Sequence, residues 1–418
     1  MKFWFVTAFI IAFISGSVAL LHLQKSESSR IGLLYSQTGT MASEEKVIAE
    51  MVRMAVEEIN DEGGLLNKKI EIVEYDGRSD PEEFAKGASA LISGGATTII
   101  GCWTSASRKA VKPVLEEKGG LLFYPVQYEG GEDSEHIIYL GLSANQQINP
   151  TISYIKKHYG NTVYLVGSDY IYPRMADLYI KAMAGFMGIR VAGSAYLPLG
   201  STDFSGVIEQ IRRSKPDAII NTINGSSNIA FFKALRDANI TAQEIPVFSL
   251  SVDQSSVQAI ASAIGNDPLI GHYATWSYFD TINHPANTVF NEKLRHRFGP
   301  DYRATDAGYK AYMAVQFWKN AVLNAKTTDT EILRSNIKRE SMDSVVGIVY
   351  IDPQNNHLSQ TVRIAAIGPR GFEVRWSSEH PVLPHPYPSI KSREFWEQSP
   401  LELYRSWNNR WERPQERQ

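Results

Sequence analysis

The sequence contains a single cysteine, Cys102, in 418 residues. One cysteine cannot form an intrachain disulfide, and it excludes a zinc site built from paired cysteines. It also excludes a lipoprotein anchor, which needs a cysteine where the leader is cleaved. The residues around Cys102 supply no base that would activate its thiol. We therefore expect it to be a small buried residue at the end of a strand.

Several other features are missing. No basic tract with interleaved aromatic residues is present, and 42 Lys and Arg face 45 Asp and Glu, so a nucleic-acid partner is not expected. The sequence has no phosphate-binding glycine loop, dinucleotide fingerprint, metal-binding H-E-x-x-H motif or G-x-S-x-G elbow. Ser105 and Lys109 stand at the spacing of a Ser–Lys dyad, yet serine is an ordinary residue at a helix start. We expect no catalytic residue, metal or cofactor, and hence not an enzyme; an amidohydrolase stays as an alternative.

A long apolar run occurs at the amino end. Met1-Lys2 precedes an apolar core over residues 3–14, small residues follow to Ala19, and the apolar character continues to Leu23. This order is typical of an export signal. The run is also roughly long enough to cross a bilayer, so an uncleaved anchor is an alternative. We therefore expect residues 1–23 to be a signal peptide or membrane anchor, and the protein to be periplasmic or held at the inner membrane.

The chain after residue 30 alternates between strand and helix patterns. Apolar runs at Ile31–Tyr35, Ile70–Asp76 and Thr98–Gly101 are separated by amphipathic segments, which indicates a parallel sheet covered by helices on both faces. The pattern restarts near Asn145, which predicts a second lobe. We predict an N-terminal lobe at residues 30–147 with 273–345, a C-terminal lobe at 148–272 with 346–380, and a tail at 381–418 whose many aromatic residues pack on a lobe or a partner.

The stretch Thr98–Glu129 carries the best candidate site. Loops that leave the carboxyl ends of neighbouring parallel strands meet at the ligand crevice, so the residues after Gly101 and after Tyr124 should converge. They offer aromatic faces, hydroxyls, a carboxamide and the free N–H groups of a helix start near Ser105. None of these groups is charged, which suits a small, planar, neutral polar ligand. The acidic loop Glu129–Glu135 is expected to be solvated surface.

Five motifs then suggest a family. GCWTSASRKAV, YPVQYEG, SANQQ, GSDYIYPR and NTINGSSN resemble the urea and short-chain-amide branch of the type I periplasmic binding proteins, which includes urea ABC transporter subunits and an amide sensor. The resemblance covers Ile31 to about Pro388. It implies an α/β fold of two doubly wound parallel-sheet lobes joined by a three-segment hinge, with a ligand enclosed between the lobes.

The resemblance also implies roles for individual residues. Trp103 would flank the ligand, Ser105 would contact the amide, and Tyr124 and Tyr170 would close the pocket from either lobe. Val126-Gln127 resembles the urea-type loop, whereas GSDYIYPR is closer to the amide sensor, so the choice between urea and an acetamide-like ligand stays open. The predicted ligand-binding residues are Trp103, Thr104, Ser105, Tyr124, Gln127, Tyr170, Asn224 and Asp253.

The resemblance thus implies an exported solute-binding protein that captures urea or a short aliphatic amide and delivers it to an ABC permease. The expected partners are the small neutral ligand and the permease subunits, and a homodimer is left open. The alternative is a membrane-anchored or periplasmic sensor that reports amide or urea to a regulatory partner.

Overall fold

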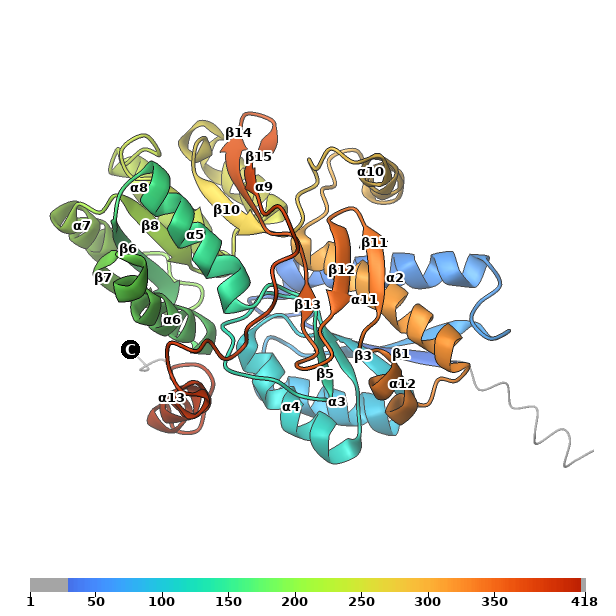
Figure 1. Ribbon diagram of the computed structural model, residues 1–418. Coiled ribbons are helices and arrows are strands. Elements are labelled where there is room, and N and C mark those ends of the chain that lie inside the picture. The colour runs from blue at the N-terminus through green and yellow to red at the C-terminus, as the bar shows by residue number, and fades with distance from the viewer. Residues whose placement is uncertain (1–28, 415–418) are drawn as a thin grey trace, which may run out of the picture.

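The computed structural model describes residues 29–414 and shows two α/β lobes side by side (Figure 1). The first lobe is built on a parallel sheet with strand order β2-β1-β3-β4-β5. Its strands are β1 (Ser29–Tyr35), β2 (Ile70–Asp76), β3 (Ala96–Gly101), β4 (Leu122–Tyr124) and β5 (Ile137–Tyr139). Its helices are α2 (Ala42–Asp61), α3 (Pro81–Ser93), α4 (Ser105–Lys118), α10 (Pro285–Phe298), α11 (Asp306–Ala325) and α12 (Thr330–Asn336).

The second lobe is built on a larger sheet with strand order β15-β14-β10-β9-β8-β6-β7. Strands β10, β9, β8, β6 and β7 are parallel, and β14 and β15 add an antiparallel edge. The strands are β6 (Thr162–Ser168), β7 (Arg190–Leu197), β8 (Ala218–Thr222), β9 (Val247–Ser249), β10 (Tyr273–Trp276), β14 (Arg363–Gly368) and β15 (Gly371–Ser377). The helices are α5 (Ala144–His158), α6 (Ile171–Met187), α7 (Ser205–Ser214), α8 (Ser227–Asp237), α9 (Gln254–Ile264) and the short 3-10 helix η1 (Asp267–Leu269).

A small antiparallel sheet lies against the first lobe. It consists of β11 (Ser341–Ser344), β12 (Gly347–Ile351) and β13 (Leu358–Ser359). Its buried residues Val349, Ile351 and Leu358 belong to the first lobe's core. The chain therefore crosses between the lobes three times, at residues 140–143, 277–284 and 360–362. The predicted fold class is confirmed.

Two predicted lobe boundaries differ from the structure. Residues 273–276 form β10, which pairs with β9 and β14 in the second lobe rather than starting a return to the first. Residues 346–359 pack on the first lobe instead of the second. A buried strand in either sheet reads as the same apolar run, so the sequence pattern cannot show which sheet a strand joins.

The turn between β3 and α4 directs the chain toward the second lobe. Cys102 is fully buried with a φ of 61°, and its N–H donates to the carbonyl oxygen of Leu34 at 2.9 Å. Thr104 then caps α4, because its side chain accepts a hydrogen bond from the Ser107 N–H. Burial of Cys102 raises the pKa of its thiol well above its ordinary value. The cysteine is thus the small buried residue that the sequence predicted.

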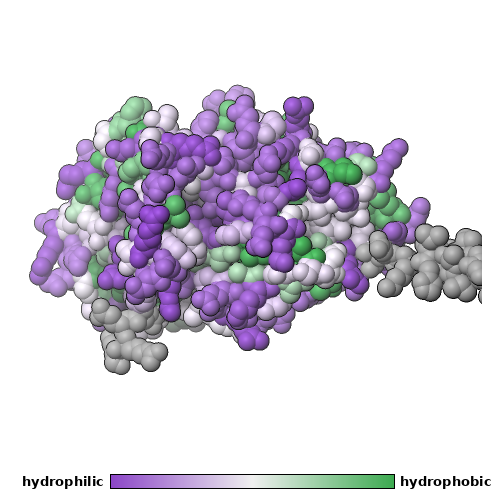
Figure 2. Space-filling model, turned by 90° about the horizontal axis from the view of Figure 1, so that it is seen from below, coloured by the Kyte–Doolittle hydropathy of each residue, from purple (hydrophilic) through white to green (hydrophobic). Residues whose placement is uncertain are grey.

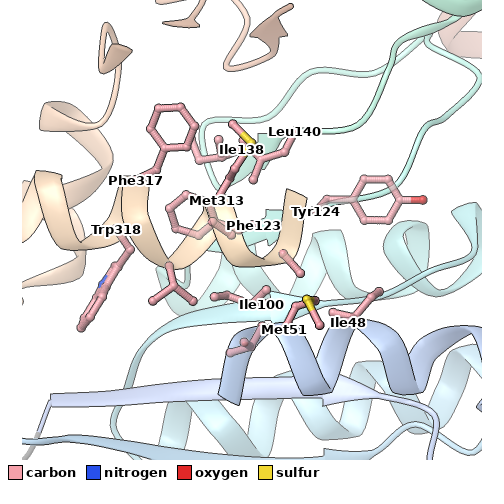
Figure 3. Packing of buried hydrophobic residues seen from close by; sticks show 14 of the residues in the cluster. Ile48, Met51, Ile100, Phe123, Tyr124, Ile138, Leu140, Met313, Phe317 and Trp318 are labelled. Atoms are coloured by element: carbon pink, nitrogen blue, oxygen red, sulfur yellow. The ribbon is translucent and has the colours of Figure 1, made fainter. Parts of the chain in front are cut away.

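The first lobe's core lies between its sheet and helices α2 and α11. Figure 3 shows Ile48 and Met51 of α2, Ile100 of β3 and Phe317 of α11 in one cluster. Tyr124 stands at the edge of this cluster, and its hydroxyl points away from the other labelled side chains. The core therefore fixes the Tyr124 ring, and the Tyr124 hydroxyl lies at the edge of the core, beyond the end of β4.

The carboxyl-terminal tail packs on both lobes. Helix α13 (Arg393–Ser406) lies against α6, and Trp396 is 2% exposed with its Nε1 donating to the Pro388 carbonyl. The Gly131 N–H of the first lobe donates to the Pro386 carbonyl, and the Ile171 N–H of the second lobe donates to the Trp411 carbonyl. The molecule seen from below is mostly hydrophilic, with its apolar residues in separate groups (Figure 2).

Within residues 29–414, no helix combines the length and apolar character needed to cross a bilayer. The predicted signal peptide or anchor, residues 1–23, lies outside the described residues.

Candidate functional site

The two lobes meet at the start of α4. Ala106, in its first turn, packs within the second lobe's hydrophobic cluster. Gln127, from the loop after β4, donates through Nε2 to the Leu250 carbonyl at 3.1 Å. Gln147 of α5 donates to the same carbonyl at 3.0 Å. The carboxyl ends of β3 and β4 therefore face the second lobe directly, as expected for loops at a ligand crevice.

Trp103 and Tyr124 are joined at the first lobe's edge. The Tyr124 hydroxyl donates to the Trp103 carbonyl at 2.6 Å, so its proton is already committed. Both side chains belong to the first lobe's hydrophobic cluster, and Trp103 is 5% exposed. Trp103 thus packs in the core as well as standing next to the predicted site.

Tyr170 and Tyr172 approach from the second lobe. Tyr170 is the N-cap residue of α6 and Tyr172 lies in its first turn. Burial raises the pKa of Tyr170 well above 10, and nearby Tyr172, Tyr124 and Glu129 raise it further. The Tyr172 hydroxyl lies beside the Gln127 side chain. The structure therefore brings Trp103, Ser105, Tyr124, Gln127 and Tyr170 together.

Directly beneath these groups lies a buried cluster of four charges. Arg108 donates to Glu129 at 3.0 Å and to Glu132 at 2.9 Å, and its side chain is 0% exposed. Lys109 donates to Glu132 at 3.0 Å. The expectation that Glu129–Glu135 is solvated surface was wrong for Glu129 and Glu132, which are buried because they pair with two cations of α4. Glu135, whose side chain is 81% exposed, is solvated as expected.

The surroundings of the cluster explain its charge states. Burial alone would lower the pKa of Arg108, but Glu132 and Glu129 raise it well above its ordinary value. Burial alone would raise the pKa of Glu132. The positive charges of Arg108 and Lys109 have the larger effect and hold the pKa of Glu132 well below its usual range. The rings of Tyr124 and Tyr128 lie 4.9 and 4.5 Å from the guanidinium. Two cations and two carboxylates thus give a cluster with no net charge.

The Ser105 hydroxyl belongs to this cluster. Its Oγ donates to Glu129 Oε2 at 2.5 Å and accepts from Arg108 Nη1 at 3.0 Å. Lys109, the other half of the Ser–Lys spacing, donates to Glu132. The structure therefore gives Ser105 a carboxylate and a guanidinium as its partners and not an activating lysine.

Thr104 faces a different part of the interlobe space. With Ser79, Glu45 and Glu412 it lines a cavity of about 160 Å³, to which the second lobe adds Leu199. Burial raises the pKa of Glu45 to about 8 and that of Glu412 to about 7. Glu412 comes from the tail, so the tail closes one side of this cavity.

Asn224 and Asp253 lie beyond strand ends of the second lobe, and both side chains already have hydrogen-bond partners within that lobe. The Asn224 carboxamide donates to the Thr222 carbonyl. Asp253 caps α9 by accepting from the Ser256 N–H, and it stands close enough to Glu44 of α2 to raise that pKa, after the larger effect of burial. Their assignment to the ligand stays a prediction.

Sequence reasoning missed Arg108 and Glu129. A usable signal was present in the sequence. Arg108 and Lys109 lie in the first turns of α4, and Glu129 and Glu132 follow β4. Strands β3 and β4 end at the same sheet edge, so these opposite charges could be expected to meet. No group of three or more His, Cys, Asp or Glu side chains in the described range is placed to hold a metal ion.

Comparison with known proteins places the chain among binding proteins. A sequence model of the periplasmic binding protein domain matches residues 29–393. Among curated proteins, the Leu/Ile/Val-binding protein BraC3 of Rhizobium johnstonii is 27% identical over 195 residues, which are 45% of this chain and 53% of that protein. Limonene hydroxylase of Geobacillus stearothermophilus is 29% identical over 124 residues, 29% of this chain and 23% of that one.

The fold has solved counterparts. A solute-binding protein of an ABC transporter from Rhodopseudomonas palustris, solved with p-hydroxybenzoic acid, superposes with a TM-score of 0.76 at 20% identity, covering 85% of this chain and 98% of that one. At this identity the likeness concerns the fold alone. The chain aligns with less than two thirds of the length of the curated proteins named here.

Proposed function

The chain belongs to the periplasmic binding protein family, whose members bind solutes and are not enzymes, and on that premise we propose that it captures urea or a short aliphatic amide for an ABC transporter. Export to the periplasm by the amino-terminal segment and transfer of the ligand to permease subunits are parts of this proposal.

The observation that carries the ligand class is the balance of charge beneath the site. Arg108 donates to Ser105, Lys109 follows it in α4, and both are paired with Glu129 and Glu132. A carboxylate guest could use the N–H groups at the α4 start, but Arg108 and Lys109 are already paired and would not offset its charge. It would also lie near the carboxylate of Glu129, which is bonded to Ser105. A neutral guest incurs no such penalty.

The related proteins bind guests of another kind. Leucine, isoleucine, valine and p-hydroxybenzoic acid, the ligands named for BraC3 and for the solved structure, all carry a carboxyl group. The fold is similar to theirs, but the charge-neutral cluster of this chain favours a ligand without a carboxyl group. Urea and acetamide present both N–H donors and a carbonyl acceptor, which suit the Gln127 carboxamide, the tyrosine hydroxyls and the α4 start.

Size sets the expected affinity. Urea and acetamide have about four heavy atoms, and at about 1.5 kcal/mol per atom the binding free energy reaches roughly 6 kcal/mol, a Kd of tens of micromolar. Isothermal titration of the purified protein with urea, formamide, acetamide, propionamide, leucine and p-hydroxybenzoate tests the proposal. We expect heat from at least one of the first four. Heat from leucine or p-hydroxybenzoate alone would overturn it.

A further inference from the structure

We propose that Glu129 determines the specificity of the site by fixing the Ser105 hydroxyl as an acceptor, so that the guest must donate an N–H to it. The inference rests on the proposed function, since it concerns the same site, and it assigns a role to a residue that touches Ser105 rather than the ligand.

The hydrogen-bond count at Ser105 is the first step. A serine hydroxyl donates one hydrogen bond and accepts up to two. Its proton goes to Glu129 Oε2 at 2.5 Å. A guanidinium can only donate, so the 3.0 Å contact with Arg108 Nη1 takes one lone pair of the Ser105 oxygen. One lone pair is left, and a ligand can meet it only with a donor.

The second step is the rigidity of this arrangement. Arg108 donates through Nη2 to Glu129 at 3.0 Å and through Nε to Glu132 at 2.9 Å. Its guanidinium also lies over the rings of Tyr124 and Tyr128. Arg108 and Glu129 are both at most 4% exposed. Reversing the Ser105 proton would leave a buried carboxylate oxygen of Glu129 without its donor, which is costly away from water. The guest therefore adapts to Ser105 and not the reverse.

The consequence separates three molecules of nearly the same shape. Acetamide offers an N–H where acetone offers a methyl group and acetate an oxygen. Acetone would leave the Ser105 lone pair unmet, and acetate would place an oxygen against it beside a second carboxylate. A site built around a hydrogen bond discriminates strongly against the analogue that lacks it. We expect acetamide to bind about tenfold or more tightly than acetone, with acetate weaker still.

The experiment measures the affinities of urea, acetamide, acetone and acetate for the full protein, for three single variants, and for the two double variants that add each Glu substitution to Ser105→Ala. Glu129→Gln leaves one acceptor oxygen where the structure uses two. With that oxygen on Arg108 Nη2, an NH2 group faces Ser105 in place of the oxygen that accepts its proton. Glu132→Gln is the matched control, because it removes the same charge from the same cluster without touching Ser105. Ser105→Ala removes the hydroxyl itself. Circular dichroism establishes that each variant is folded.

We expect the preference for acetamide over acetate to fall about tenfold further in Glu129→Gln than in Glu132→Gln. In the Ser105→Ala background the two Glu substitutions should have equal effects. Equal effects in the presence of Ser105 would overturn the inference while leaving the proposed function intact. Absence of binding to both urea and acetamide by the unmodified protein would overturn the function, and the inference with it.

Ser105→Ala decides the matter if Glu129→Gln does not fold. It should reduce the preference for acetamide over acetone about tenfold, because the Ser105 oxygen no longer accepts the amide N–H. A preference for acetamide as large in Ser105→Ala as in the unmodified protein would contradict the role of Ser105 as acceptor, and so the role of Glu129.

Discussion

Replacement of Arg108 by methionine tests the electrostatic design of the lobe. The side chain is 0% exposed and contacts Ser105, Glu129 and Glu132. Its removal leaves two buried carboxylates with one ammonium between them. Removing one partner of a buried ion pair costs about 3–5 kcal/mol, because the remaining charge has lost both water and partner. We expect a loss of that size in the free energy of unfolding at pH 7.5.

The pH dependence of this loss identifies its cause. In the unmodified protein the folded pKa of Glu132 is below its unfolded value, so its contribution is present above about pH 4.5 and lost on acidification. In Arg108→Met one carboxyl should instead have a raised pKa, and its penalty then shrinks as the pH falls. We expect the deficit at pH 5 to be about 1–2 kcal/mol smaller than at pH 7.5, since one pKa unit corresponds to about 1.4 kcal/mol.

Unfolding in guanidinium chloride, followed by tryptophan fluorescence, gives both values; urea is unsuitable because it is a proposed ligand. Arg213→Met is the matched control, since its ion pair with Glu209 is 76% and 62% exposed and should contribute under about 1 kcal/mol. Equal losses in the two variants, or an Arg108→Met deficit that does not change with pH, would refute the reasoning.

Two further substitutions test other buried groups. The folded pKa of Glu45, about 8, is above its unfolded value, so its burial lowers stability progressively as pH rises from about 4.5 to 8. Glu45→Gln should therefore raise the guanidinium midpoint at pH 9 and leave it nearly unchanged at pH 4.5; the same gain at both pH values would contradict this. Trp396→Ala should cost about 3–5 kcal/mol of unfolding free energy, whereas Phe186→Ala, at 82% exposure, should cost little. Equal melting temperatures for those two variants would show that the tail contributes no packing energy.

The sequence predicted most of the fold because local signals determine it. Alternating strand and helix patterns predicted a parallel sheet in each lobe, and both sheets have a parallel core, to which β14 and β15 add an antiparallel edge in the second lobe. Lobe membership was harder. Strands β10 and β12 carry apolar patterns that fit either lobe, and only their pairing and packing determine which lobe they join.

The candidate site was predictable where one residue type fits one position. Local chemistry predicted a helix cap at Thr104 or Ser105, and the structure has it at Thr104. The approach of Tyr124 to Trp103 follows from parallel strand ends that meet at one edge. The burial of Glu129 and Glu132 was not predictable from their segment alone. An acidic loop is ordinarily solvated, and it is buried here because Arg108 and Lys109 of another segment supply its counter-charges.

Stability alone does not explain why four charges lie under the site. A buried ion cluster is often no more stable than apolar side chains of the same volume, because desolvation cancels most of the attraction. The guest proposed here, urea or a short amide, is neutral and has about four heavy atoms, so charge cannot hold it. Ordering mobile side chains around it would consume its small binding energy. Arg108 and Glu129 orient the Ser105 hydroxyl before any guest arrives, and the Trp103 carbonyl orients that of Tyr124. Polar groups fixed in advance are therefore what such a small ligand requires, and the charged cluster supplies them at Ser105.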